Sequence, residues 1–365
     1  MKKLISNLMA IAMNLQLFAD AGSVVNTTTG SVNAYTGAAE ATNAMSGELK
    51  TFYDTELLEN ARVEMFYAQF AKKQPLPQGN GTTVEWRRWN TFAKADVLQE
   101  GVIPDGQKFG MSSKTGTINQ YGTYAAISDK LEMHAYDDTI LGATEEMGAS
   151  AAETQETLIR DALLVNTNVL YCDNITVATG AVVSTPTSCA TMEATAETMS
   201  ILTPDSIAKA VTIMKKNKVP TIGGKYYAVI HPSVAYDLRK SKEWVEAHKY
   251  GAPGEIFNGE IGELHGCRFI ENVFAPVLGG TDYKNKAGGV TYATYMFGKD
   301  AFGIIDPEGA ALEMIIKDKA QAGGPLNQFS TIGYKLETNG ATVLYTERVM
   351  RIMSCSSFSA TDEVN

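Results

Sequence analysis

The sequence predicts an α+β fold, because long helical patterns and paired strand patterns occur along the same chain of 365 residues. Apolar residues recur at helical intervals over residues 129–171, the longest such stretch. In residues 84–89, Val84 and Trp86 alternate with Glu85 and Arg87, a two-residue period that is typical of a strand. Short apolar runs between glycine-rich turns after residue 279 predict further strands.

The chain is long enough for two or more domains, and its composition is that of a globular protein. Apolar residues make up 44% of the chain and charged residues 20%, so disorder is not indicated. A formal net charge of -10 argues against broad binding of phosphate groups, which needs a surplus of Lys and Arg. No C-x-x-C pair occurs, so metal or redox chemistry has no spacing support and reduced cytosolic thiols are expected. The four cysteines are Cys172, Cys189, Cys267 and Cys355.

The first residues allow two interpretations. Lys2 and Lys3 precede an apolar stretch at residues 4–18, and residues 19–21 look like a signal-peptidase site. Polar residues interrupt that stretch, however, and its apolar residues fall at helical spacing, which suits an amphipathic arm lying on a partner. Residues 20–45 are rich in Thr, Gly, Ala, Ser and Asn and predict a flexible arm or linker.

A helix is predicted at residues 46–72, ended by Pro75 and Pro77 because proline cannot continue the helical hydrogen bonds. Next comes an extended hairpin, in which the strand at residues 84–89 pairs with a return strand at residues 115–128. A long polar excursion separates the two strands. Such a hairpin buries little against its own chain and would gain most stability by lying across a neighbour.

Two further helices are predicted in the middle of the chain. The first spans residues 129–171, with Asp129 as a candidate cap and a bend or break at Gly142 and Gly148. Residues 172–200 then predict a loop or irregular strand. The second helix, residues 203–216, begins with a threonine cap, a first-turn proline and an acidic first turn, and ends in lysines that complement its carbonyl end.

A buried strand at residues 226–230 is predicted to turn at His231-Pro232 into a short helix with Val234, Ala235 and Leu238 on its apolar face. Residues 253–266 read as an ordered loop. The remaining strands are predicted at residues 267–270, 292–297, 301–305, 312–317, 332–336, 341–345 and 348–353.

No catalytic motif is recognisable: the chain lacks a G-x-S-x-G elbow, a Walker loop, an H-E-x-x-H pair and a dinucleotide fingerprint. Three evenly spaced histidines invite a metal hypothesis, but no helical or hairpin spacing brings two of them together. They are His231, His248 and His265. Three glutamates in the ordered loop could suggest acid–base work, but solvated or intersubunit charges are preferred. They are Glu255, Glu260 and Glu263.

The strand at residues 84–89 could stack on nucleic-acid bases through its tryptophans and arginines. Alternation places Trp86 and Arg88 on one face and Arg87 and Trp89 on the other. The aromatic and basic side chains are therefore divided between two faces and do not form one binding surface. Packing of the hairpin on a neighbouring subunit is therefore the preferred interpretation.

Several stretches together resemble one known family. They are ELKTFYDTELLENA (residues 48–61), GTTVEWRRW (81–89), EGVIPDG (100–106), QYGTYAAISD (120–129), IHPSVAYDL (230–238), EIFNGEIGELHGCRFIE (255–271), and GGPLNQ with IGYK (323–335). With these stretches, the chain resembles a tailed-bacteriophage major capsid protein of the N-four-like family. MNLQLFAD (residues 13–20) is similar to the openings of other phage capsid chains, which favours the arm over secretion.

The resemblance implies the tailed-phage major capsid fold of the Hong Kong 97 type. Its expected parts are an N-terminal arm (residues 1–47), a helix leading into the peripheral domain (48–78), an extended hairpin loop (79–128), a peripheral domain with a long spine helix (129–200), an axial domain (201–326), and a return to the peripheral domain with a C-terminal tail (327–365). The loop around residues 255–266 would be a packed structural segment near other subunits.

The resemblance also implies a structural protein and not an enzyme. The chain would assemble with itself into hexamers and pentamers of an icosahedral shell around double-stranded DNA, without sequence-specific DNA contact. Separate scaffold and portal proteins are expected partners, assembly is expected in the bacterial cytoplasm, and the product is the virion. No catalytic residue, cofactor, metal or membrane partner is predicted. Relatives that crosslink use a loop lysine, but no partner can be assigned to Lys94, Lys108 or Lys114, so no crosslink is predicted.

Two other functions stay open at this point. One is an exported enzyme or surface protein with a signal peptide at residues 1–21, and the other is a non-viral nanocompartment shell of the same fold.

Overall fold

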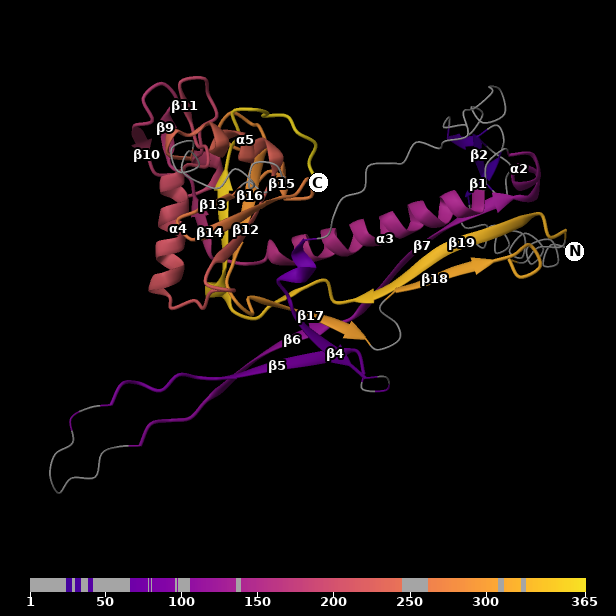
Figure 1. Ribbon diagram of the computed structural model, residues 1–365, viewed down its shortest axis with the longest axis horizontal. Coiled ribbons are helices and arrows are strands. Elements are labelled where there is room, and N and C mark those ends of the chain that lie inside the picture. Colours follow the sequence, from indigo (N-terminus) through magenta and orange to yellow (C-terminus); the bar gives the residue numbers. More distant parts are fainter. Residues whose placement is uncertain are drawn as a thin grey trace, which may run out of the picture. The chain divides into compact units, whose positions relative to one another are not determined.

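The computed structural model (Figure 1) describes the backbone of three short strands near the N-terminus and most of the chain after residue 65. The described ranges are residues 24–27, 30–33, 39–41, 66–77, 79, 81–95, 97, 106–135, 139–244, 262–307, 312–322 and 326–365. Most of the predicted arm (1–47), the helix before residue 66 and most of the loop at 253–266 lie outside these ranges. The chain divides into two compact units, residues 1–62, 120–152 and 310–337, and residues 63–119, 153–309 and 338–365.

The first unit is built on a six-stranded sheet with the order β18-β19-β7-β1-β2-β3. The strands β18 and β19 are antiparallel, β1 lies parallel to β7, and β1, β2 and β3 follow one another as antiparallel neighbours. Their bounds are Leu312–Lys317 (β18), Phe329–Thr338 (β19), Asn119–Ser128 (β7), Val24–Thr27 (β1), Gly30–Asn33 (β2) and Ala39–Ala41 (β3).

Two helices follow β7, where one interrupted helix was predicted. The short helix α2 (Asp129–His134) is capped by Ser128, whose hydroxyl accepts the backbone N–H of Leu131 at 3.3 Å, so the predicted cap at Asp129 is wrong by one residue. The helix α3 (Thr139–Leu163) passes through Gly142 and Gly148 without the predicted break. A Cβ at either glycine would meet nothing within 4 Å, so no close neighbour requires glycine at these positions.

The first half of α3 packs on the sheet of the first unit. Its half-buried residues Ile140, Ala143 and Met147 contact the buried side chains of Ile127 and Ile332. One turn further along, Ala151 packs against the next two inward-facing side chains of β19. Residues at helical intervals on α3 therefore cover Ile332, Tyr334 and Leu336, which alternate along β19.

The second unit contains a seven-stranded sheet with the order β13-β14-β12-β16-β21-β8, and β15 pairs with β16 beside it. The strand bounds are Gly262–Leu264 (β13), Cys267–Glu271 (β14), Tyr226–Ile230 (β12), Thr291–Phe297 (β16), Val349–Ser354 (β21), Val169–Tyr171 (β8) and Val277–Leu278 (β15). All residues of β16 and β21 are buried, as expected for central strands with both faces covered.

Helices α4 (Pro204–Lys216) and α5 (Pro232–Lys240) share one core with this sheet. Along β12, Ala228 and Ile230 face that core, whereas Val229 belongs to a second core with Tyr67 and the end of α3. The sheet therefore has an apolar layer on each face.

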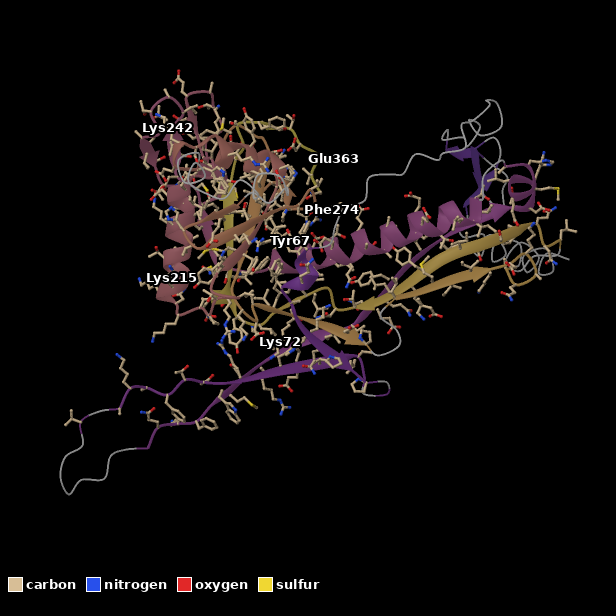
Figure 2. The ribbon with its side chains drawn as sticks, in the orientation of Figure 1. Tyr67, Lys72, Lys215, Lys242, Phe274 and Glu363 are labelled. Carbon is tan, nitrogen blue, oxygen red and sulfur yellow. The ribbon has the colours of Figure 1, made fainter. Side chains whose placement is uncertain are left out.

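Both helix starts are confirmed. The Thr203 hydroxyl accepts the N–H of Ser206 at 3.2 Å, with Pro204 at the first helical position. At α5, Nδ1 of His231 accepts the N–H of Ser233 at 3.2 Å. Figure 2 shows Lys215 in the last turn of α4, where a cation complements the helix dipole.

Residues 172–200 are more ordered than predicted. They form a three-stranded sheet, β10-β9-β11, and a short 3-10 helix η3. The bounds are Asn174–Thr176 (β9), Val182–Ser184 (β10), Cys189–Thr191 (η3) and Thr198–Met199 (β11). The buried Asn174 side chain holds them together, because its Nδ2 donates to Ser184 Oγ (2.9 Å) and Thr191 O (3.1 Å), and its Oδ1 accepts the Glu193 N–H (2.9 Å).

The predicted helix at residues 46–72 is wrong over its last turn. The short 3-10 helix η2 (Tyr67–Gln69) is followed by strand β4 (Lys72–Leu76), which lies at the edge of the sheet β20-β17-β4. Its partner β17 (Phe302–Pro307) runs parallel to it, and β20 (Thr342–Val343) covers only part of the predicted strand at 341–345. An edge strand tolerates Pro75 because the missing N–H removes no ladder hydrogen bond. A last 3-10 turn, η5 (Thr346–Arg348), precedes β21.

Candidate assembly surface

The predicted hairpin is present in the second unit as strands β5 (Thr83–Trp89) and β6 (Met111–Thr117). They pair antiparallel from Thr83 opposite Thr117 to Trp89 opposite Met111, and they run side by side in Figure 1. The Asn90 N–H donates to Gly110 O at 2.9 Å and extends the pairing by one step. The single return strand predicted at 115–128 is instead divided at Ile118, because β6 pairs with β5 whereas β7 joins the sheet of the first unit.

Beyond its base, the hairpin exposes large apolar side chains. Trp89 is 62% exposed and Phe109 58% exposed, and Phe92 and Met111 are also exposed. The rings of Trp89 and Phe109 stack with centroids 4.2 Å apart, and Phe92 stacks on Phe109 at 5.4 Å. We call the three stacked rings, Trp89, Phe92 and Phe109, the aromatic row. A contiguous exposed apolar group is informative because it marks a surface that another molecule covers.

The base of the hairpin is fixed by close packing. The Trp86 ring lies 2.8 Å from where a Cβ on Gly116 would be, and 2.9 Å from the same position on Gly303 of β17. Only glycine leaves room for the indole at both points. The Arg88 guanidinium lies over the Tyr345 ring, 5.1 Å from its centroid. These contacts fix the base of the hairpin against β17 and Tyr345.

The alternation predicted for β5 is confirmed, and it separates the two tryptophans. Trp86 is half-buried and faces β17, whereas Trp89 is exposed. Arg87 pairs with Glu85 at 2.9 Å, which neutralises one cation on this strand. Lys94, Lys108 and Lys114 are all exposed. This arrangement does not provide one basic, aromatic face of the kind that nucleic-acid binding uses.

The first unit also leaves an apolar face open, on its edge strand β18. Leu312, Met314 and Ile316 are exposed and alternate along the strand, so they point to one side of the sheet. In the register with β19 they lie opposite Leu336, Tyr334 and Ile332, which are buried. We call the three exposed residues the β18 strip.

Among the described residues, those considered for metal or acid–base chemistry do not form a possible metal site. His231 caps α5, and burial lowers its pKa. His265 lies in a turn with a φ of 52°, and Glu263 pairs with Lys225. His248, Glu255 and Glu260 lie outside the described residues. Within the described part of the chain, no three His, Cys, Asp or Glu side chains form a possible metal site.

One buried carboxylate was not predicted, because its partners are far away in the sequence. Glu156 on α3 is 1% exposed, and its Oε1 accepts the N–H groups of Phe66 (3.0 Å) and Tyr67 (3.2 Å) and the Asn272 side-chain N–H (2.9 Å). Burial raises its pKa, against the three hydrogen bonds, which lower it. Figure 2 labels Tyr67 at the segment that Glu156 holds. Glu156 joins three segments of the second unit and is a structural group.

The cysteines are buried and free. Burial raises the pKa of Cys172 to about 12 and that of Cys355 to about 12, so both remain thiols at neutral pH. The described helices include none that combines the length and apolar character needed to cross a membrane. The exposed apolar side chains of the hairpin and of β18 are the candidate contact surfaces among the described residues.

Comparisons with known proteins agree with this description. The family model described as phage capsid protein matches residues 112–346. The capsid structure of the cyanophage P-SCSP1u is 15% identical, covering 86% of this chain and 95% of that chain, with a TM-score of 0.58. The acid-stable capsid of Helicobacter pylori bacteriophage KHP30 is 11% identical, covering 86% and 98%, with a TM-score of 0.61. The cyanophage Pam1 capsid is 13% identical, covering 89% and 100%, with a TM-score of 0.61.

No curated protein sequence matches the chain. The structural likenesses nevertheless show its fold, which is the mixed α+β tailed-phage capsid fold of the Hong Kong 97 type, as predicted. The assignment to the N-four-like group remains a prediction. Because the family model covers more than half of the chain and the fold is the one found in tailed-phage capsids, this chain belongs to the phage capsid protein family.

Proposed function

We propose that this chain is the major capsid protein of a tailed bacteriophage and assembles into the hexamers and pentamers of an icosahedral shell around double-stranded DNA. The observation that carries the proposal is the aromatic row. A stacked group of large apolar side chains exposed on a two-stranded hairpin is unfavourable in an isolated chain and favourable once a neighbour covers it.

The predicted domain plan is retained as part of the proposal. The hairpin β5–β6 would be the extended loop, α3 the spine helix, and the sheet around β12 with α4 and α5 the core of the axial domain. The β18 strip would give a neighbouring copy a second apolar surface. Because such contacts are heterologous, they close into rings when the rotation between copies permits.

The charge balance suits a container for nucleic acid. A net charge of -10 keeps the shell from binding phosphate groups broadly, so packaged DNA can move as it enters. Separate scaffold and portal proteins are proposed as partners, with assembly in the bacterial cytoplasm. The chain is proposed to work through its interfaces and to have no catalytic role.

The test is assembly of the expressed chain, followed by size-exclusion chromatography and negative-stain microscopy. We expect shells or hexamers from the unmodified chain. The double variant Trp89→Ser, Phe109→Ser should remain folded by circular dichroism and lose shells, because it removes the stacked pair. The matched control is Phe358→Ser, which removes a 66% exposed ring elsewhere in the same unit and should assemble normally. Monomers from the unmodified chain, or normal shells from the double variant, would contradict the proposal.

A further inference from the structure

An uncharged segment lies on the surface of the second unit, in the small sheet β10-β9-β11. Residues 174–192 contain no Asp, Glu, Lys, Arg or His, although 20% of the whole chain is charged. Within this segment residues 177–185 are all exposed, including Val182 at 57% and Val183 at 59%. An exposed segment of this length without a charge is the composition of a surface that another molecule covers.

The strand β10 is also an open edge. It lies at the end of its sheet, and within the described part of the chain its strand partner is β9 alone. Open edges are protected by charged side chains, by proline, by bulges or by a short strand length. Strand β10 contains no charge and no proline, and Pro186 is buried beyond its end, so only its short length and its register shift limit the edge. The register shift between Val182 and Ser184 confines the free edge to a few residues.

Hydrogen bonds within the subunit fix the conformation of β10. The Asn174 side chain ties β9 to Ser184 and to Thr191, and the Thr176 N–H donates to Ala181 O at 2.9 Å across the turn. A strand that is already fixed loses little conformational entropy when a second strand adds to it.

We infer that β10 pairs antiparallel with β10 of a second copy of this chain, across a two-fold axis between neighbouring subunits. Copies with a net charge of -10 repel one another, so an uncharged edge is where they can approach closely. An isologous contact brings each residue of the edge next to the same short segment of the partner, and the exposed valines then meet valines. A charged partner strand would lose hydration without gaining an ion pair.

A single cysteine tests this pairing. The four native cysteines are buried, so Val183→Cys adds an accessible thiol that can form a disulfide only with its counterpart. In assembled shells treated with a mild oxidant, we expect covalent dimers of this variant on a non-reducing gel. The matched control Val165→Cys, at a position that is 79% exposed and follows α3, should remain monomeric. Monomeric Val183→Cys that reacts with a bulky maleimide in shells would overturn the inference.

A charge at the same position gives a second readout. Val183→Lys should lose intact shells while its subunit remains folded, because two lysines would face each other across the axis. Val183→Thr keeps a β-branched, uncharged side chain and should assemble normally; normal shells from Val183→Lys would count against the pairing. The β10 pairing rests on the proposed shell function, but different results would refute the pairing and the shell. An unmodified chain that forms no shells refutes the shell, and the oxidant test on concentrated Val183→Cys chain then decides the pairing by itself.

Discussion

At the scale of single residues, Glu156 shows how a buried charge can serve the fold. Its Oε1 accepts three N–H groups from segments that are distant in the sequence, whereas Oε2 has no hydrogen-bond partner among the described residues. Burial raises its pKa above the ordinary value, so ionisation is less favourable in the folded chain than in the unfolded chain. The hydrogen bonds need an acceptor at Oε1 and do not need a full negative charge.

This geometry predicts the effect of Glu156→Gln. The folded carboxyl has the higher pKa, so the folded state binds more protons than the unfolded state between the two pKa values. Its contribution to stability is therefore full below the unfolded pKa and is lost as the pH rises through the folded pKa. Glutamine keeps the acceptor and cannot ionise, so it should abolish this pH dependence and be at least as stable at neutral pH. Urea unfolding followed by tryptophan fluorescence measures this, because Trp86, Trp89 and Trp244 all lie in the second unit.

The control for that experiment is Glu156→Ala, which leaves the buried Tyr67 N–H and the part-buried Phe66 N–H without their acceptor. It should lower the free energy of unfolding by about 1–3 kcal/mol for each group. A Glu156→Gln variant that is as unstable as Glu156→Ala would show that the negative charge itself holds the segments together.

At the scale of elements, α4 illustrates a helix determined by its own ends. Thr203 caps it, Pro204 occupies its first position, Asp205 lies in its first turn, and two lysines end it. Each of these groups acts within one turn of the helix, so the sequence predicts them without knowledge of the fold. Strand β4 is the opposite case, because its edge position depends on β17, which lies more than 200 residues further along the chain.

The cap of α4 gives a second prediction. Thr203→Ala should lower the free energy of unfolding by about 1 kcal/mol, because the Ser206 N–H loses its acceptor. The matched control is Thr212→Ala on the same helix, where an exposed hydroxyl donates only to the Ala208 carbonyl at 2.7 Å and its removal should cost almost nothing. Urea titration of both variants distinguishes them. Equal losses would mean that the cap contributes no more than any surface threonine.

At the scale of the whole molecule, the chain shares its fold with solved capsids whose sequences differ widely from its own. The solved capsids are only 11–15% identical to this chain, yet each is covered almost completely. A fold retained at such low identity is specified by the apolar pattern of its elements more than by particular side chains.

Deletion of residues 97–112 tests the hairpin as a part of the whole. The described residues of this segment bury little within their own unit, since Val97 and most residues from 106 to 112 are exposed. The shortened chain should therefore keep its circular dichroism spectrum and its unfolding midpoint, and it should fail to form shells in negative-stain images. Normal shells from this deletion would refute the role assigned to the hairpin.

The sequence by itself determined what depends on neighbours along the chain. The α+β class, the starts of α4 and α5, the strand at β12 and the hairpin β5–β6 all follow from periodicity, caps and turns, which act over a few residues. Only the tertiary structure decided the contacts between distant segments. It placed Trp86 between Gly116 and Gly303, made residues 67–76 a 3-10 turn and an edge strand, and left β10 as an open edge. The physical reason is that burial and strand pairing are settled by partners that local propensity does not reveal.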